Sequence, residues 1–281
     1  MRAPDGIPSL PPKVLAAASA CAGGITRIES LGGLSGRIVA RVQGTGRSVV
    51  AKGPVSTPEV EVARRFPELL LRHSVRVPRV FATPETADDG TWIVMEYLPD
   101  PLPQGRWGAD GQVIAMLRAL HTLPSDAVED LPGRYLPGWD DALTASAAST
   151  LGADDAVVDR LAVLAERAQP LFDPRCVVSG DPNPLNWRVD GEQCPVLLDL
   201  ERLTVASPAL DLAIVLAGLP DRAAAAAVTA AYGAGAPTVD EVLLAKAWSV
   251  VELAATAADG TPAHDVVMYV RPAFFSWLER L

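Results

Sequence analysis

Cysteine and histidine are scarce in this chain of 281 residues, which contains three of each. The cysteines, Cys21, Cys176 and Cys194, lie far apart and form no CxxC pair, so neither a disulfide framework nor a cysteine-rich zinc site is indicated. The histidines form no HExxH motif and Ser179 lies in no GxSxG motif, so a zinc or serine hydrolase has no local support. This composition suits a reducing cytoplasm.

Basic residues are also short in number, with 24 against 34 acidic residues and a formal net charge of -10. A protein that binds nucleic acid by neutralising phosphates carries the opposite excess, so we expect no nucleic-acid partner. The charge instead favours partners that are cationic or neutral.

We expect neither a membrane-spanning segment nor an export signal. Asp211, Asp221 and Arg222 interrupt the alanine-rich stretch after Pro208, and no run of about 18 uncharged apolar residues exists. KVLAAASACAGG has the small apolar residues of a signal-peptide core, but the prolines and Asp5 before it make a poor beginning for one. We therefore expect an amphipathic first helix and no membrane partner.

Two patterns of hydrophobicity divide the chain. Short β-like runs separated by glycine turns fill residues 25–98, with one helical stretch near residues 58–72. Helical periodicity dominates from Asp110 onward, and the proline-rich segment PDPLPQG at residues 99–105 is the natural joint. We predict an α+β fold with two lobes. Residues 1–98 form a small antiparallel sheet with one helix, and residues 99–281 form a larger, mainly helical lobe.

The segment VVSGDPNPLNWRVDGEQCPVLLDLER, residues 177–202, predicts a β-hairpin among the helices. It carries Asp181, Asn186 and Asp199, the residue types that phosphoryl transfer needs. One carboxylate lies near the attacking hydroxyl, while an amide and a second carboxylate hold Mg²⁺ against nucleotide phosphates. Asp, Asn, Pro and Gly also favour turns, so a D-x4-N spacing alone is more often a loop than a site.

A lysine at the end of an apolar strand supports the nucleotide hypothesis. Lys52 closes the run SVVAK, where a charge is costly unless it is paired. In a kinase site such a lysine holds the α and β phosphates and a helix glutamate orients it. We expect that partner to be Glu61, with Glu59 as the alternative; Glu68 fits less well because a proline precedes it.

A glycine-containing loop precedes this strand. The segment SLGGLSGR lies between two predicted strands, and its Gly33 and Ser35 are candidates to cover the phosphates. Two adjacent glycines would by themselves indicate only a hairpin turn. The order of glycine turn, strand lysine, helix glutamate, linker, D-x4-N and a later aspartate is hard to obtain by chance.

With these motifs the chain resembles the aminoglycoside phosphotransferase and choline kinase-like family. The resemblance extends from about Ile25 to Tyr232 and depends on GGLSGR, VVAK, VPRVFA, WIVMEYLP, SGDPNPLNW, LLDLER and SPALDLA. It implies a bilobal protein-kinase-like fold, in which residues 1–98 bind the nucleotide and residues 99–281 hold the catalytic loop and the acceptor.

The resemblance also implies roles for single residues. Asp181 would be the catalytic aspartate, Asn186 and Asp199 the magnesium ligands, and Lys52 the phosphate-holding lysine. Asp211, in SPALDLA, would brace the catalytic loop.

Two departures from related patterns carry consequences. Ser179 stands where the family has a histidine before Gly-Asp, which puts the rigidity of the catalytic loop in question. The segment LDLER stands where a protein kinase has Asp-Phe-Gly, and no Ala-Pro-Glu segment follows it. The missing Asp-Phe-Gly and Ala-Pro-Glu segments favour a small-molecule acceptor over a protein.

The strand WIVMEYL predicts the adenine-binding edge. If the joint begins here, the carbonyl of Glu96 and the N–H of Leu98 would face the base, with Met95 at the back of the pocket. The same run also fits an ordinary buried strand. The choice between ATP and GTP stays open, because it would depend on backbone geometry.

The acidic excess suggests a cationic acceptor with a hydroxyl, and we favour an aminoglycoside or a basic peptide antibiotic. A metabolic kinase for an amino alcohol or sugar, a catalytically weak kinase-like binding module, and an unrelated hydrolase or metal protein are the alternatives. Candidate contacts to the acceptor are Asp140, Asp141, Glu201 and Glu252, each of which also fits a solvated or helix-terminal acid.

Overall fold

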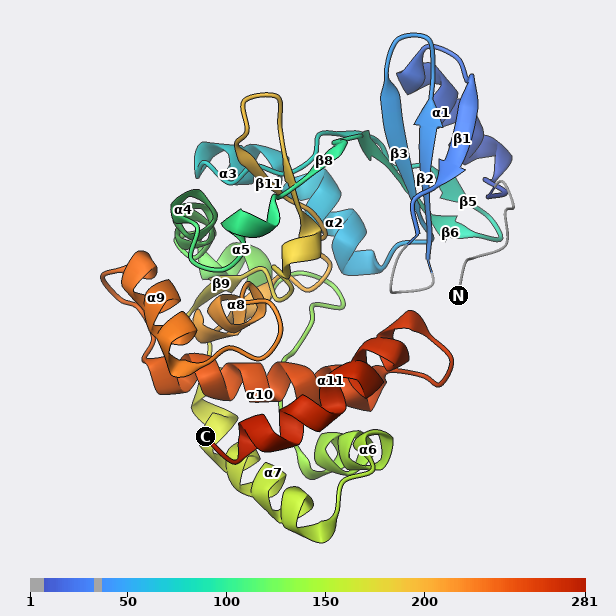
Figure 1. Ribbon diagram of the computed structural model, residues 1–281. Helices are drawn as coiled ribbons and strands as arrows, with labels where there is room; N and C mark the ends of the chain where they lie inside the picture. Colours follow the sequence, from blue (N-terminus) through green and yellow to red (C-terminus); the bar gives the residue numbers. More distant parts are fainter. Residues whose placement is uncertain (1–7, 33–36) are drawn as a thin grey trace.

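Five short strands form an antiparallel sheet in the N-terminal part of the computed structural model, which describes residues 8–32 and 37–281 (Figure 1). Val, Ile and Ala alternate toward one face, as in β2, where Ala40 and Val42 are buried and their neighbours are half-buried. The strand order is β1-β2-β3-β7-β4. The bounds are β1 Arg27–Ser30, β2 Ile38–Gln43, β3 Ser48–Gly53, β4 Val80–Ala82 and β7 Ile93–Glu96.

Helix α1 (Pro12–Ala22) covers one face of this sheet, which confirms the predicted first helix. It ends at Gly23 in the left-handed conformation. The turn between β2 and β3 passes so close to this end that a Cβ on Gly44 would lie 2.3 Å from the carbonyl oxygen of Ala22. The helix and sheet share a small core made of Val14, Ala18, Ala22, Val42, Val49, Ala51, Trp92 and Val94.

The single helix predicted near residues 58–72 is two helices, α2 (Thr57–Arg65) and α3 (Pro67–Arg72), divided at Pro67. Together with α1, the described residues up to 98 therefore contain three helices, because the one predicted near residues 58–72 is divided in two. Val62, Phe66 and Leu70 do not join the small core. They belong to the large core of the C-terminal part.

The proline-rich segment predicted to join the two lobes forms a short strand that pairs with a strand of the C-terminal part. Strand β8 (Asp100–Pro101) lies antiparallel to β10 (Trp187–Val189), which pairs with β11 (Pro195–Leu197) in the predicted hairpin. Because the segment after residue 99 is bonded to this sheet, we propose a division of the chain between residues 98 and 99. Two further pairs, β5 (Glu85–Thr86) with β6 (Gly90–Thr91) and β9 (Cys176–Val178) with β12 (Thr204–Ala206), complete the strands.

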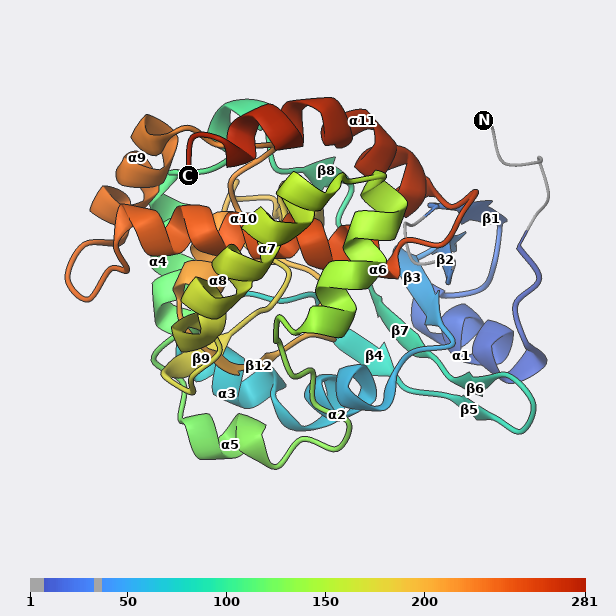
Figure 2. The same ribbon diagram turned by 90° about the horizontal axis from the view of Figure 1, so that it is seen from below.

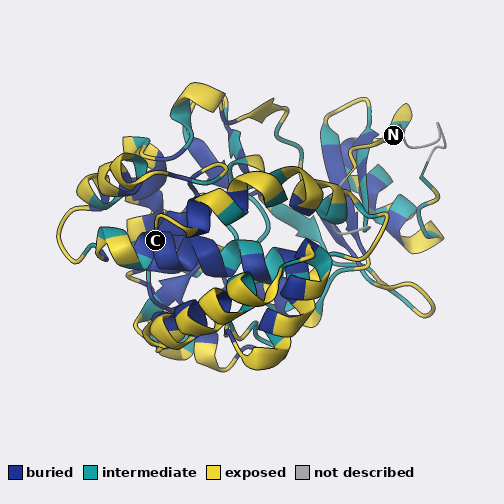
Figure 3. Cartoon of the chain, turned by 60° about the horizontal axis from the view of Figure 1, so that its bottom comes forward, coloured by how far each residue is buried: buried dark blue, intermediate teal, exposed yellow. Residues whose placement is uncertain are grey.

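Helices fill the rest of the C-terminal part, as the periodicity predicts. Helix α10 runs through its middle and is largely buried, while α7 and α11 expose their outer faces (Figures 2 and 3). No helix in the described ranges is long and apolar enough to cross a membrane. The bounds are α4 Gly111–Leu120, α5 Ser125–Glu129, α6 Asp141–Leu151, α7 Asp155–Ala168, α8 Ala209–Ile214, α9 Arg222–Tyr232, α10 Val239–Thr256 and α11 Pro262–Leu278, with short 3-10 turns at Gln104–Arg106, Gln169–Leu171 and Pro184–Asn186.

Helix α10 contains a buried cation, Lys246, whose side chain is 7% exposed. Its Nζ donates to the carbonyl of Leu216 at 2.7 Å, and it forms no ion pair among the described residues. Burial lowers the pKa of Lys246 to about 8, opposed by the charge of Asp181. The unfolded chain therefore binds more protons than the folded one between about pH 8 and 10, so this lysine makes stability rise with pH in that window.

We expect Lys246→Met to raise the free energy of unfolding at pH 7 by roughly 1–3 kcal/mol, because it removes a buried charge. The gain should shrink at pH 9.5, where the lysine is already neutral. Urea unfolding of both proteins at the two pH values measures the effect. A variant less stable than the wild type at pH 7 would show that the ammonium makes stabilising contacts.

Candidate active site

The catalytic loop predicted at residues 179–186 follows strand β9. Gly180 adopts a φ of +79°, and a Cβ at this position would lie 2.4 Å from the carbonyl oxygen of Arg202. Only glycine fits this close approach without strain. The loop thus turns sharply against the segment that follows Asp199.

Asp211 braces this loop, as the resemblance implied. Its carboxylate is fully buried on α8 and accepts the backbone N–H of Ser179 at 2.8 Å and that of Gly180 at 2.9 Å. The ring of His121 lies 3.0 Å from the same carboxylate and 2.9 Å from the hydroxyl of Tyr232. His121, the C-cap residue of α4, therefore supports the loop, a role that no sequence motif indicated.

Ser179 itself is buried, and its hydroxyl has no hydrogen-bond partner among the described residues. The histidine that the family carries here is absent, yet the backbone N–H of residue 179 is still held by Asp211. The loop is therefore anchored through main-chain groups, which a serine supplies as well as a histidine does.

Asp181 lies at the loop mouth with both carboxylate oxygens engaged. Oδ1 accepts the side-chain amide of Asn183 at 2.8 Å, and Oδ2 accepts that of Asn186 at 3.0 Å. Burial raises the pKa of Asp181 to about 6, although these amides and the nearby Arg202 favour the ionised form. A fixed carboxylate with a pKa near neutrality is suited to accept a proton. Asn183 was not singled out from the sequence.

Asn186 and Asp199 are brought together by the hairpin. The backbone N–H of Leu198 donates to the carbonyl of Asn186 at 2.7 Å, which fixes the two strands at this point. Asp199 adopts a φ of +56°, and its buried Oδ1 has no partner among the described residues. The Asn186 amide nitrogen is occupied by Asp181, so its oxygen is turned elsewhere. Two unengaged hard oxygen donors fit Mg²⁺.

Lys52 joins the N-terminal sheet to this pair. Its Nζ lies 2.7 Å from Glu59 Oε1 and 2.9 Å from Asp199 Oδ2, and only 6% of the residue is exposed. Burial alone would lower the pKa of Lys52, but the carboxylates of Asp199 and Glu59 raise it above its usual value. The lysine is therefore a fixed cation held by two carboxylates, and its contact with nucleotide phosphates stays a prediction.

The predicted partner Glu61 is wrong, and Glu59 takes its place. Residues two apart in a helix are separated by roughly 200° around its axis. Only one of the two glutamates can therefore face Lys52. Helix α2 begins at Thr57 and turns Glu59 inward, where it is 7% exposed. Glu61 faces outward and lies 3.6 Å from Arg65 one turn later.

These two glutamates give a matched pair of variants. We expect Glu59→Gln to lower nucleotide-dependent turnover at least tenfold, because Lys52 then loses one of its two anchoring charges. Glu61→Gln, which removes the same charge from the other face of the same helix, should change turnover less than twofold. Steady-state assays of both variants test the assignment, and equal effects would contradict it.

Of the other residues predicted to contact the nucleotide, the structure describes Met95, Glu96 and Leu98. Gly33 and Ser35 lie outside the described residues. Met95 and Glu96 end strand β7, and Leu98 follows it at the joint. The Glu96 carboxylate accepts the backbone N–H of Arg79 at 3.2 Å. The backbone contacts of Glu96 and Leu98 to a base stay predictions.

Two of the four acids predicted to bind the acceptor are engaged by arginines. Glu201 pairs with Arg37, and Glu252 pairs with Arg202. The hydroxyl of Tyr135 bonds to Glu252 and to Arg202, and the guanidinium of Arg202 stacks 4.1 Å from the centre of the Tyr135 ring. Arg202 is thereby fixed beside the loop that carries Asp181, a feature that sequence reasoning missed.

The other two predicted acids lie at a helix start. Asp140 caps α6 by accepting the N–H of Leu143 at 2.7 Å, and Asp141 occupies the first turn. Both are exposed. Their helix-terminal positions account for their presence, and contact with an acceptor stays a prediction.

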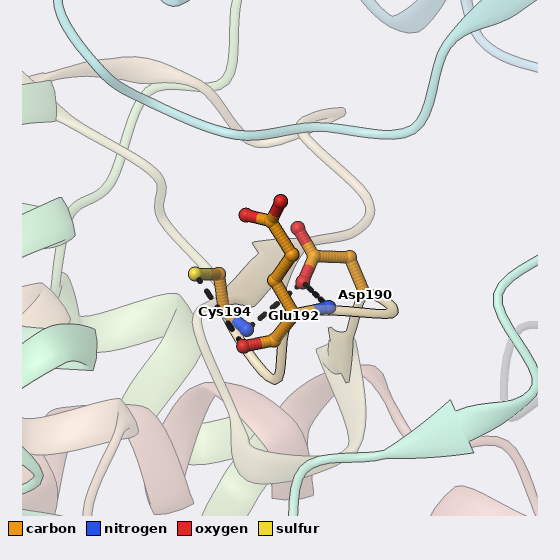
Figure 4. Close-up of side chains that lie close together, drawn as sticks. All are labelled: Asp190, Glu192 and Cys194. Atoms are coloured by element: carbon orange, nitrogen blue, oxygen red, sulfur yellow. Dashed lines mark hydrogen bonds between the residues drawn. The ribbon is translucent and has the colours of Figure 1, made fainter.

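One other acidic cluster lies on the turn of the β10–β11 hairpin and has a structural explanation (Figure 4). Asp190 Oδ1 accepts the N–H groups of Glu192 and Cys194, both at 2.9 Å, and Oδ2 pairs with Arg76. The cluster closes the turn and is not assigned as a metal site.

A cavity of about 730 Å³ lies behind the joint, between α2–α3, β4 and the β10–β11 hairpin. It is lined by Glu96 and Leu98 but by none of Lys52, Asp181 and Asp199. The contact of Lys52 with Asp199 therefore lies outside this cavity, where the sheet meets the hairpin and a nucleotide-binding cleft is expected.

A strand lysine, a helix glutamate, an anchored aspartate and an asparagine–aspartate pair between two lobes define a kinase-like phosphotransferase. The chain belongs to the phosphotransferase enzyme family, whose model matches residues 26–242. A comparison with curated proteins finds no match.

Solved structures show the same fold at low identity. The GDP complex of aminoglycoside 2'-phosphotransferase-IIIa is 16% identical with a TM-score of 0.65, and the match covers 94% of this chain and 96% of that one. Choline kinase LicA from Streptococcus pneumoniae is 13% identical with a TM-score of 0.66, covering 95% and 98%. Aminoglycoside phosphotransferase from Alicyclobacillus acidocaldarius is 18% identical with a TM-score of 0.57, covering 99% and 98%. These likenesses confirm the bilobal fold.

Proposed function

We propose that this protein transfers the γ-phosphate of ATP or GTP to a hydroxyl group of a small cationic molecule. The observation that carries the proposal is the position of Asp181. Its carboxylate is fixed by two amides at the mouth of a braced loop, and the same hairpin presents Asp199 to Lys52. That arrangement supplies a proton acceptor and a phosphate-binding cation across one cleft.

Each residue then has a defined task. Lys52, oriented by Glu59, binds the α and β phosphates. Asp181 accepts the proton as the acceptor oxygen bonds to the γ-phosphorus, and the bond from that phosphorus to the β-phosphate oxygen breaks to release the nucleoside diphosphate. Asn186 and Asp199 would hold Mg²⁺, which when bound neutralises phosphate charge. The buried Asp211 keeps the loop in place throughout.

The acceptor class is supported by charge and by the relatives. One solved relative, aminoglycoside 2'-phosphotransferase-IIIa with 14% identity in this complex, is bound to GDP and kanamycin, and another is a choline kinase. Both kanamycin and choline are hydroxylated cations. With a net charge of -10, this chain suits such a molecule. An aminoglycoside or basic peptide antibiotic is our first candidate, and its modification would confer resistance.

An amino alcohol is the second candidate, because Glu201 and Glu252 are each paired with an arginine. A polycation needs several unpaired carboxylates, whereas a molecule with one ammonium group needs fewer. The paired state of these two acids therefore favours a smaller positive charge on the acceptor.

A nucleotide-consumption screen tests the function. Purified protein with ATP or GTP and Mg²⁺ is incubated with cationic antibiotics, amino alcohols and neutral sugars, and phosphorylated product is confirmed by mass spectrometry. For a polycation, kcat/KM should fall steeply between low and high salt, while an amino alcohol should respond little. Turnover with neutral sugars alone would contradict the cationic assignment, and nucleotide binding without any turnover would favour a binding module.

The raised pKa of Asp181 predicts an acid limb in the pH profile. An unperturbed aspartate titrates near pH 3.9, but here the group is protonated below about pH 6 and can no longer accept a proton. We expect kcat/KM to fall about tenfold per pH unit below pH 6. Assays from pH 4.5 to 8, with circular dichroism as a control for folding, measure this limb. A profile that is flat down to pH 5 would contradict the assignment.

A further inference from the structure

Arg37 lies among the residues that hold Lys52. It directly precedes β2, and its Nη1 lies 3.1 Å from Glu59 Oε2 and also contacts Glu201. Glu59 comes from α2 and Glu201 from the turn after Asp199, so one guanidinium joins three segments far apart in the chain.

The surrounding charges are unequal. Glu59, Asp199 and Glu201 each offer a carboxylate oxygen, and these atoms lie within 4.8 Å of one another. Against the three carboxylates stand two cations, Lys52 and Arg37. Lys52 occupies Glu59 and Asp199, and Arg37 occupies Glu59 and Glu201.

The burial and the partners of Arg37 differ from those of an ordinary surface ion pair. The side chain of Arg37 is 25% exposed, so part of its charge is removed from water, and its neighbour Glu59 already has Lys52 as a partner. An arginine fork binds phosphate oxygens in the same two-pronged way as carboxylates. A nucleoside triphosphate beside Lys52 would bring several such oxygens within reach of this guanidinium.

We propose that Arg37 is a phosphate-contacting residue that recognises the β and γ phosphates of the nucleotide. This inference rests on the proposed function. Without nucleotide, Glu59 and Glu201 hold the guanidinium in the cleft. With nucleotide, the guanidinium contacts phosphate oxygens on the side of the cleft that faces Glu201, and the phosphate count becomes a determinant of affinity.

The test compares binding of ATP, ADP and AMP by calorimetry at constant Mg²⁺, which needs no knowledge of the acceptor. We expect Arg37→Gln to weaken ATP binding at least tenfold and ADP binding less, and to leave AMP binding within about twofold. Arg37→Lys, which keeps the charge but loses the fork, should fall between this variant and the wild type. Arg64→Gln is the matched control. Arg64 lies on α2 and forms an ion pair with Glu85, with 2.8 Å between the charged atoms, and it pairs with none of Glu59, Asp199 and Glu201.

Other outcomes overturn the proposal. An equal loss for the three nucleotides would make Arg37 a structural link, and a gain would make it a restraint on the empty cleft. If the wild type binds ATP and Arg37→Gln binds it equally well, only this inference fails. If the wild type binds none of the nucleotides, the proposed function fails and the inference with it.

Discussion

Replacing Asp181 by asparagine is expected to lower kcat at least a hundredfold while the affinity for nucleotide changes less than about twofold. General-base catalysis contributes roughly 10²–10⁴-fold, and an amide cannot accept the proton of the acceptor hydroxyl. The variant keeps the shape of the side chain, but its single amide oxygen can accept from only one of the two donors, Asn183 and Asn186. Initial rates at saturating nucleotide and acceptor, together with nucleotide binding by calorimetry, separate the two effects.

Asp190→Asn is the control for this variant, since it changes an aspartate of the same hairpin at the turn remote from the cleft. It should keep near wild-type kcat. If Asp181→Asn kept more than about a tenth of the wild-type kcat, the loss of transition-state stabilisation would be under about 1.4 kcal/mol. Asp181 would then not be the proton acceptor.

Asp199→Asn is expected to raise the Mg²⁺ concentration needed for half-maximal activity at least tenfold and to reduce turnover strongly even at saturating Mg²⁺. A neutral amide is a weaker ligand for a hard dication than a carboxylate. The same change removes one of the two charges that hold Lys52. Activity and nucleotide binding, each titrated with Mg²⁺, measure the shift.

A second variant that removes a charge from Lys52 separates the loss of this contact from the loss of a magnesium ligand. Glu59→Gln also removes a charge from Lys52 but leaves Asp199 in place, so it should reduce turnover without an equal rise in the Mg²⁺ requirement. If the Mg²⁺ dependence of Asp199→Asn equalled that of the wild type, coordination by Asp199 would be ruled out.

Local patterns account for what the sequence predicted well. The hairpin that carries Asp181, Asn186 and Asp199 is specified by a turn at Asp190-Gly191 and by short apolar strands, all within one segment. Lys52 is specified in the same way by its strand. The helices after residue 110 follow from periodicity and from capping residues such as Asp110.

Choices that depend on helix start or on distant contacts could not be predicted. The face of α2 that meets Lys52 depends on where the helix begins, and a shift of one or two residues exchanges Glu59 for Glu61. Arg37 and Glu201 are 164 residues apart in sequence. No local pattern links them, so the pairing that neutralises Glu201 becomes visible only in the folded chain.

The contacts of Asp211 could be predicted only in part. Its role in bracing the loop could be inferred from a resemblance, because it lies in the segment SPALDLA. Its side-chain partner, His121, lies 90 residues away at the C-cap of α4. A histidine in an amphipathic helix has many explanations, and only packing in three dimensions selects this one.

The two separate cores imply two levels of local stability. The α1 and sheet unit has a small core, whereas α2 and α3 belong to the large one. The sheet unit should therefore open in hydrogen exchange at a lower free energy than the helical part. The ion pair between Lys52 and Glu59 crosses from one unit to the other, and a nucleotide in the cleft would do the same. Such a ligand would slow amide exchange in strands that it does not touch, since binding to the closed form stabilises that form by mass action.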